Sequence, residues 1–424
     1  MKVTLVNKSD STGGAAVACY RLLVALSENN VDVQLLVQEK KKDNEFCIST
    51  TQSKFKNYLN FARFAAERLF FYFYEKSKEV RFAYSPANTG ENISNHSSIK
   101  QTDVIHLHWI NQGFLSIRDL KAITASKKPI IWTLHDMWSF TGGCHYAGDC
   151  EGYKSECGHC PFLKNPSKKD LSFRVRRKKI KLFENSNITF VTCSKWLAKK
   201  AQESSLLKSA NIISIPNPID TNLFSAKDKT IVRKSLELSE NKFLILFGSA
   251  NIFDKRKGLE FFIQALYILR SELPNTANEI ELVIFGKSNQ QIHSLLPYKA
   301  KNLSYLDSIE KIAGVYSCVD LFVLPSLEDN LPNTVMESLA CGTPVVAFNI
   351  GGIPEMVDHR ENGYLAEYKS AKDLAEGIRW IMYEADKKLL SEKARSKVMA
   401  NYTHEIVAEK YKNLYNKVLN KEPL

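Results

Sequence analysis

The chain has 424 residues, a length that suits two domains of about 200 residues, each able to bury its own core. Its 44% hydrophobic and 25% charged residues are typical of a folded globular protein and exclude a disordered or fibrous chain. The net charge of +12 favours anionic partners.

The first residues, MKVTLVNKSD, become polar after Val6, which is not the pattern of a signal peptide. No uninterrupted apolar run reaches the roughly 18 residues that cross a bilayer. We therefore expect a cytoplasmic protein. Nine cysteines in such a chain favour free thiols or a bound metal over a disulfide framework.

A strand predicted over Val3–Val6 leads through a polar loop to Gly13-Gly14 and then to an apolar helix. A glycine pair at this place lets a phosphate approach the backbone N–H groups at the positive end of the helix. A tight turn without a ligand is the alternative. VDVQLLVQ, from Val31 to Gln38, predicts the second strand.

The segment from Phe55 to Tyr74 is rich in aromatic residues interleaved with lysine and arginine. This composition predicts a basic amphipathic helix. Two interpretations stay open, because the aromatic residues form either a stripe facing the core or a face that lies on a membrane.

DVIHLHW and PIIWTL predict two further strands, and His135-Asp136 follows the second of them. A histidine at such a strand end can donate a hydrogen bond to a sugar hydroxyl or a phosphate. A capped residue of the core is the alternative. His106 and His108, at the end of the earlier strand, are further candidates.

Four cysteines crowd the loop of residues 141–164, here called the Cys-rich loop, with five, six and two residues between them. A tetrahedral Zn²⁺ suits four thiols in so short a loop, and four protein ligands leave no open position, so the ion would be structural. An iron–sulfur cluster and four free thiols are the alternatives. The predicted ligands are Cys144, Cys150, Cys157 and Cys160.

Nine cations follow between residues 164 and 181, with Asp170 as the only acid among them. Nucleic acid, an anionic membrane and a phosphorylated substrate are the candidate partners, and a solvated helix face is the alternative. We favour the membrane surface, because the segment has neither an aromatic stacking platform nor a recognisable nucleic-acid-binding module.

ITFVTC and NIISI predict the last strands of the first domain, and Pro216-Asn217-Pro218 begins a linker. We place an N-terminal domain at 1–215, a second domain at 216–400 and a final helix at 401–424. FLILFG starts the second sheet, and its next loop carries Arg256 and Lys257, which suit a diphosphate. A solvated basic turn is the alternative. LVIFG and the segment 304–306 predict further strands.

DLFVLPS and PVVAF predict buried strands on either side of a helix that Asn333 can cap. Parallel sheets bind ligands where their strands end, and here stand Asp329 and Glu337 with seven residues between them. Carboxylates suit sugar and ribose hydroxyls, because these groups need acceptors. A loop acid and a solvated helix acid are the alternative.

The stretch from Val323 to Glu355 resembles the donor-binding signature of the family 4 retaining glycosyltransferases of the GT-B fold. The shared pattern is an acid, seven residues, Glu337, an Ala-Cys-Gly-Thr-Pro-Val-Val turn and a Gly-Gly-x-Pro-Glu loop. The resemblance implies an α/β fold with two Rossmann-like, doubly wound domains facing across a cleft. It also implies that the last helix crosses back to the first domain.

The resemblance assigns roles to individual residues. Glu337 would hold the ribose hydroxyls, while the acid that contacts the donor sugar falls on Asp329, with Glu328 just before it. Lys257 and Arg256 would bind the phosphates, and His135 would contact the donor sugar. Further donor-binding candidates are Gly13, Gly14, Ser308, Ile309, Asn333 and Thr334.

We therefore expect a retaining, metal-independent transferase that moves a sugar from a nucleotide-sugar to a glycan or lipid-linked acceptor. The enzyme would act in capsule, O-antigen or exopolysaccharide assembly. It would work at the inner face of the cytoplasmic membrane. We expect no nucleic acid partner and no catalytic cofactor. A nucleotide-sugar epimerase or phosphorylase, and a non-catalytic protein that binds anions or membranes, are the alternatives.

Overall fold

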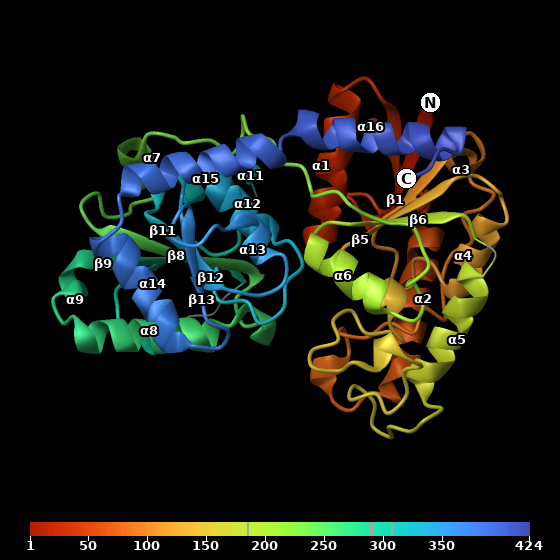
Figure 1. Cartoon of the computed structure of the whole chain (residues 1–424), viewed down its shortest axis with the longest axis horizontal. Coiled ribbons are helices and arrows are strands. Elements are labelled where there is room, and N and C mark those ends of the chain that lie inside the picture. The colour runs from red at the N-terminus through yellow and green to blue at the C-terminus, as the bar shows by residue number, and fades with distance from the viewer. Residues whose placement is uncertain (185, 288–291, 307) are drawn as a thin grey trace. The chain divides into compact units, whose positions relative to one another are not determined.

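A computed structural model describes residues 1–184, 186–287, 292–306 and 308–424. The chain divides into two compact units, each drawn with its labelled elements in Figure 1. The first unit comprises Met1–Pro218 together with Val407–Leu424, and the second comprises Ile219–Ile406. In these ranges no helix combines the length and the apolar character needed to cross a bilayer.

A parallel sheet in the order β3-β2-β1-β4-β5-β6-β7 forms the centre of the first unit. The predicted strands are all present, while the short β3 was not predicted. The strands are β1 (Lys2–Ser9), β2 (Asp32–Glu39), β3 (Cys47–Ser49), β4 (Val104–Leu107), β5 (Ile130–Leu134), β6 (Ile188–Thr192) and β7 (Ile212–Ser214).

Helices cover both faces of this sheet, because alternate residues of each strand are buried on opposite sides. Val3 and Leu5 lie under α1 and α16, whereas Val6 and Ile105 belong to the cluster of α2, α4 and α5. The helices are α1 (Gly14–Glu28), α2 (Lys54–Tyr72), α3 (Ser97–Lys100), α4 (Ile117–Thr124), α5 (Leu171–Phe183), α6 (Lys195–Glu203) and α16 (His404–Asn420).

The C-terminal helix α16 is tied to this sheet by two buried tyrosines. The Tyr415 hydroxyl lies 2.8 Å from His106 Nδ1, and the Tyr411 hydroxyl lies 3.0 Å from Thr133 Oγ1. His106 Nε2 lies 2.7 Å from Thr133 Oγ1 as well. His106 is thus a fully buried residue of the core, and its interpretation as a ligand-facing histidine was wrong.

The second unit has a parallel sheet in the order β10-β9-β8-β11-β12-β13. One predicted strand was wrong, because residues 304–306 form no strand and the chain pairs instead over β10. The edge strand β13 was not predicted. The strands are β8 (Phe243–Asn251), β9 (Ile280–Lys287), β10 (Ala300–Asn302), β11 (Leu321–Leu324), β12 (Val345–Phe348) and β13 (Gly363–Ala366).

Helices α8 and α14 pack together over one face of the second sheet. Helix α12 begins at Asn333 as predicted, but Pro332 occupies its cap position and no side chain caps it. The helices are α7 (Lys229–Ser235), α8 (Leu259–Glu272), α9 (Thr276–Glu279), α10 (Ile292–Leu295), α11 (Ile309–Cys318), α12 (Asn333–Ala340), α13 (Ile353–Met356), α14 (Ala371–Tyr383) and α15 (Lys387–Asn401). Both units are therefore doubly wound α/β units, and the predicted fold class is confirmed.

The long helix α2 turns most of its aromatic residues away from the protein. Phe55, Tyr58 and Phe61 are each at least 65% exposed, whereas Phe71 is buried and stacks on Tyr84 with a centroid distance of 4.6 Å. The interpretation of the segment as a stripe facing the core is thus wrong for most of its length.

The basic segment between residues 164 and 181 is also divided. Arg176 and Lys179 of α5 are buried, while the other cations of the segment are exposed. Lys179 donates to the carbonyl oxygen of Thr141 at 3.1 Å and lies 3.6 Å from the centroid of the Trp138 ring. These two cations hold the interior of the unit together rather than forming part of a charged surface.

Candidate active site

In the first unit, the loop after β1 leads into α1 through Gly13. This glycine has φ +90°, and a Cβ added there would meet no heavy atom within 4 Å. Conformation, and not crowding, therefore requires glycine, and the space beside the backbone is open to a ligand. Asp10 fixes the loop, because its Oδ2 accepts hydrogen bonds from the backbone N–H groups of Lys41 and Lys42 at 2.9 and 2.8 Å. Gly13 and Gly14 thus begin a helix whose positive end suits an anion.

His135 stands directly after β5, beside the end of β4. Its Nε2 lies 3.0 Å from His108 Nδ1, and its Nδ1 lies 3.5 Å from the Cys193 sulfur. Burial lowers the pKa of His135 to about 4, so the imidazole is neutral at pH 7. A neutral ring suits a hydroxyl better than a phosphate, because it brings no positive charge. His108 Nε2 is buried and has no hydrogen-bond partner among the described residues.

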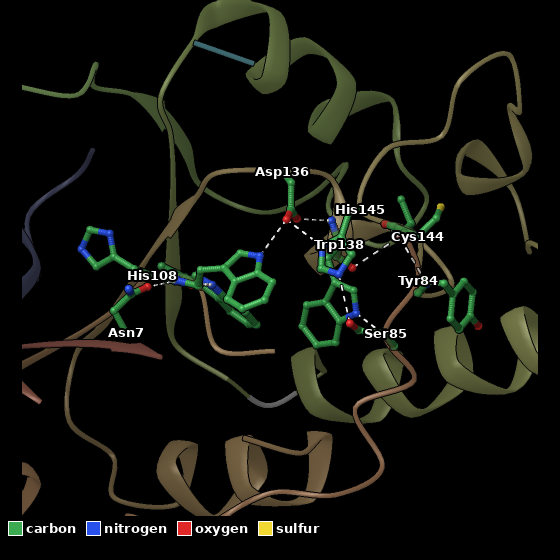
Figure 2. A network of polar contacts seen from close by, with 12 residues as sticks. Asn7, Tyr84, Ser85, His108, Asp136, Trp138, Cys144 and His145 are labelled. Carbon is green, nitrogen blue, oxygen red and sulfur yellow. Dashed lines mark hydrogen bonds and ion pairs between the residues drawn. The ribbon is translucent and has the colours of Figure 1, made fainter. Parts of the chain in front are cut away.

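Asp136 connects the end of β5 with the Cys-rich loop, as Figure 2 shows. Its Oδ2 accepts from Trp109 Nε1 at 2.9 Å and lies 2.7 Å from His145 Nδ1, while its Oδ1 accepts from the Trp138 N–H at 2.8 Å. Burial raises the pKa of Asp136, but the charge and hydrogen bonds of His145 and the two donors outweigh it and hold the pKa below its usual value.

The far side of the His145 ring completes a chain of three polar residues. His145 Nε2 lies 3.0 Å from Ser85 Oγ, so Ser85, His145 and Asp136 are connected in the order of a hydrolytic triad. Ser85 is nevertheless fully buried, and its Oγ cannot reach a substrate. The chain therefore positions Asp136. No sequence pattern indicated these contacts, because Ser85 and His145 stand 60 residues apart.

In the second unit, Lys257 Nζ lies 2.7 Å from Asp329 Oδ2. The two side chains are 24% and 14% exposed, so the pair is accessible but partly desolvated. Lys257 ends the turn after β8, and Asp329 lies in the loop after β11. The structure thus brings together two residues that were predicted separately, one for the phosphates and one for the donor sugar.

Two glycines hold this pair in place by close packing. Gly258 has φ +69°, and a Cβ there would lie 1.9 Å from the carbonyl oxygen of Pro325. Gly351 has φ +60°, and a Cβ there would lie 1.8 Å from the carbonyl oxygen of Asp329. The turn after β8 and the loop after β12 therefore both press on the loop that carries Asp329.

Most of the other predicted donor-binding residues of this unit lie at helix starts. Glu337 is buried within α12, and Asn333 and Thr334 form the first turn of that helix. Thr334 Oγ1 is buried and has no hydrogen-bond partner among the described residues. Ser308 caps α11 by accepting from the Lys311 N–H at 3.3 Å, and Ile309 follows it.

Arg256 and Glu328 do not take part in the Lys257–Asp329 ion pair. Arg256 is 48% exposed and forms an ion pair with Asp254 at 2.7 Å, so it must leave that partner to reach a phosphate. Glu328 is half-buried beside Asp329. The geometry therefore favours Lys257 and Asp329 over these neighbours.

The predicted zinc ligands all line one cavity in the Cys-rich loop, together with Tyr84 and Tyr153. Cys144, Cys150, Cys157 and Cys160 are free thiols. In the described part of the chain, no three His, Cys, Asp or Glu side chains already converge as metal ligands. The zinc site stays a prediction.

Comparisons with known families place both units in the same group of enzymes. Residues 12–223, half of the chain, match the family described as Glycosyltransferase Family 4. Residues 242–384 match the family described as Glycosyl transferases group 1.

Among curated relatives, an uncharacterized glycosyltransferase of Haemophilus influenzae is 28% identical over 54% of this chain. The putative colanic acid biosynthesis glycosyl transferase WcaC of Escherichia coli is 27% identical over 58% of this chain. The chain spans 62% and 58% of the length of these two relatives.

Two solved structures share the fold. Sucrose-phosphate synthase from Thermosynechococcus elongatus has a TM-score of 0.69 at 17% identity, covering 99% of this chain and all of that one. Anabaena HepE in complex with UDP has a TM-score of 0.64 at 15% identity, covering 98% of this chain and all of that one. With the family match over half of its length, the chain belongs to glycosyltransferase family 4.

Proposed function

We propose that this glycosyltransferase moves a sugar from a nucleotide-sugar donor to a glycan or lipid-linked acceptor, with retention of the anomeric configuration. The observation that carries the proposal is the Lys257–Asp329 pair, which puts a cation and a hydroxyl acceptor side by side at a strand end. A sugar diphosphate presents both an anion and hydroxyl groups, so it complements the pair.

The proposed roles follow from charge and burial. Lys257 binds the diphosphate. It stabilises the negative charge that develops on the diphosphate as the bond between the anomeric carbon and the phosphate oxygen breaks. Arg256 assists after leaving Asp254. Asp329 accepts hydrogen bonds from the donor sugar, and Glu337 from the ribose hydroxyls. Ser308 and Ile309 border the base, and Asn333 and Thr334 contribute donors at the start of α12.

The first unit contributes groups of a different kind. His135 offers a neutral imidazole to a sugar hydroxyl, and Gly13 and Gly14 offer backbone N–H groups to an anion. Asp136 is held in place by His145 and the indole of Trp109, so it can orient its neighbour His135. In the proposed reaction the departing phosphate oxygen takes the proton of the acceptor hydroxyl, and no catalytic metal is needed.

The names of the relatives support the class of donor and pathway. HepE binds UDP, which supports a nucleoside diphosphate sugar as donor. WcaC is named for colanic acid biosynthesis, which supports a role in surface polysaccharide assembly.

Helix α2 supports a place on the inner face of the cytoplasmic membrane. Its exposed aromatic residues are flanked by the exposed Lys54 and, just beyond the helix, by the exposed Lys76 and Lys78. Aromatic rings enter the interface between head groups and acyl chains, while lysines attract anionic lipids. A lipid-linked acceptor would be available at such a surface.

The test uses a panel of uridine, guanosine and adenosine diphosphate sugars, with thermal shift and release of free nucleotide as readouts. We expect one donor to raise the melting temperature and to release its nucleotide slowly without an acceptor. A donor whose sugar is isomerised while still attached to the nucleotide would support an epimerase instead. Binding that depends on salt but not on the donor would support a non-catalytic anion-binding protein.

A further inference from the structure

The Cys-rich loop is long and irregular, yet much of it is buried. Apart from the single turn of Gly152–Lys154, residues 141–164 form no helix, and Figure 1 shows them as yellow loops of the first unit. Tyr153, Cys160 and Leu163 are buried members of the main hydrophobic cluster. A segment of this kind needs a source of order besides secondary structure.

We infer that Cys144, Cys150, Cys157 and Cys160 form a tetrathiolate site for a structural Zn²⁺, which fixes the segment that carries His145. The four thiols line one cavity, and a soft, all-sulfur ligand set selects zinc among the common divalent ions. This inference is independent of the proposed transferase activity.

The turn that carries two of the ligands is already formed. Cys157, Gly158 and His159 have φ values of 59°, 92° and 46°, three successive residues in the left-handed region. Their backbone is held from α5, because Asp170 Oδ2 accepts from the Cys160 N–H and Ser172 Oγ accepts from the Gly158 N–H, both at 2.9 Å. Strain of this kind persists where the surroundings fix it, and it often marks a ligand site.

Charge balance supports an anionic cluster at this place. Four thiolates around Zn²⁺ carry a net charge of −2, which is costly to bury without cations nearby. Lys179 and Arg176 of α5 are 1% and 9% exposed, and Lys179 Nζ donates to the carbonyl oxygen of Thr141 in the Cys-rich loop at 3.1 Å. These two buried cations would balance the charge of the cluster.

Binding changes the loop in a defined way. The four thiols release their protons, and the sulfurs move from the walls of the cavity onto one ion. Cys144 then becomes a fixed point directly before His145, which holds Asp136. The metal thus connects the order of the loop to the end of β5.

The test is metal analysis of tag-free protein purified under reducing conditions. We expect about one zinc per chain, and tetrahedral thiolate absorption bands after cobalt substitution. The double variant Cys157→Ser/Cys160→Ser should hold little zinc, while Cys318→Ser, a buried cysteine of the second unit, should keep it. Because the double variant can fail to fold, the zinc released from wild-type protein by a thiol-blocking mercurial is measured as well.

Several results would overturn the inference. The first is wild-type protein that takes up no zinc after incubation with excess metal. The second is purified protein that contains iron and sulfide, because the four thiols would then hold an iron–sulfur cluster and not zinc. Two disulfides in the Cys-rich loop, detected by mass spectrometry of alkylated protein, would show that the thiols pair with one another.

Discussion

Lys257 Nζ and Asp329 Oδ2 lie 2.7 Å apart although 72 residues separate them in the chain. The ion pair occupies a lysine that the proposed function assigns to the donor phosphates. Without a donor, Asp329 therefore holds Lys257 in place. When a donor binds, its phosphates must compete with the Asp329 carboxylate for Lys257. In the proposed function, both residues would change partners when a sugar diphosphate binds.

Replacement of Asp329 separates these two roles. In Asp329→Asn no carboxylate competes with the phosphates for Lys257, so we expect the free nucleoside diphosphate to bind as tightly as before or more tightly. Transfer should fall by roughly 10- to 150-fold, because the donor sugar loses a charged acceptor worth about 1.5–3 kcal/mol. Calorimetry with the diphosphate and steady-state kinetics measure the two effects. If Glu328→Gln abolishes transfer and Asp329→Asn does not, the acid has been misassigned.

Stability should depend on the protonation of His135. Its pKa is about 4 in the folded chain and about 6.5 when unfolded, so between these values the unfolded state binds more protons. The free energy of unfolding therefore falls as the pH falls from 6.5 to 4, and buried His106, with its pKa lowered to about 3, contributes in the same direction. In His135→Gln the slope should be smaller by at most about 1.4 kcal/mol per pH unit. Denaturation curves across this range measure it, and an unchanged slope would contradict the assignment.

Helix α2 should bind anionic membranes. Wild-type protein should sediment with vesicles that contain phosphatidylglycerol, less so at high salt, and not with neutral vesicles. The variant Phe55→Ser/Tyr58→Ser/Phe61→Ser should bind at least about tenfold more weakly with little change in stability, because its rings are exposed. Tyr267→Ser removes an exposed ring of α8 and serves as control. Equal binding of both variants to the vesicles would mean that α2 does not contact the membrane.

Gly258 should be required for the stability of the second unit. In Gly258→Ala, positive φ and the carbonyl oxygen of Pro325 both oppose a side chain, and we expect a loss of about 2 kcal/mol or more. Gly314→Ala is the matched control, because its Cβ meets only Val232 Cγ1 at 3.6 Å, and alanine favours the helix by about 0.5–1 kcal/mol. Chemical denaturation measures the free energy of unfolding of both variants. Equal stability of the two would mean that the turn before α8 accommodates a Cβ at position 258.

The sequence predicted the fold well where buried strands are long enough to show. Runs such as FLILFG and DLFVLPS are almost wholly apolar, because strands covered on both faces have no solvent side. β3 and β13 are short edge strands without such a run, and β10 was misplaced for the same reason. The exposure of α2 was undecided, since a helix has the same period whether its apolar face is buried or exposed.

The candidate site was predicted residue by residue but not as a set of contacts. Lys257, Asp329 and His135 each stand at a strand end, which a sequence pattern can indicate. The partners of Asp136 were missed, because Trp109 and His145 reach it from separate loops. Only the fold determines which loops meet.

The most direct test of the account compares turnover by wild-type protein with that of Lys257→Ala and Glu337→Ala, using the donor found in the panel. Each variant is first shown by circular dichroism and melting temperature to be folded, and Lys301→Ala, which removes a partly exposed lysine paired with Glu237, serves as control. We predict that wild type and Lys301→Ala release the nucleotide upon acceptor addition, while the other two are slower by about 100-fold or more. Near-wild-type transfer by both Lys257→Ala and Glu337→Ala would contradict the proposed site.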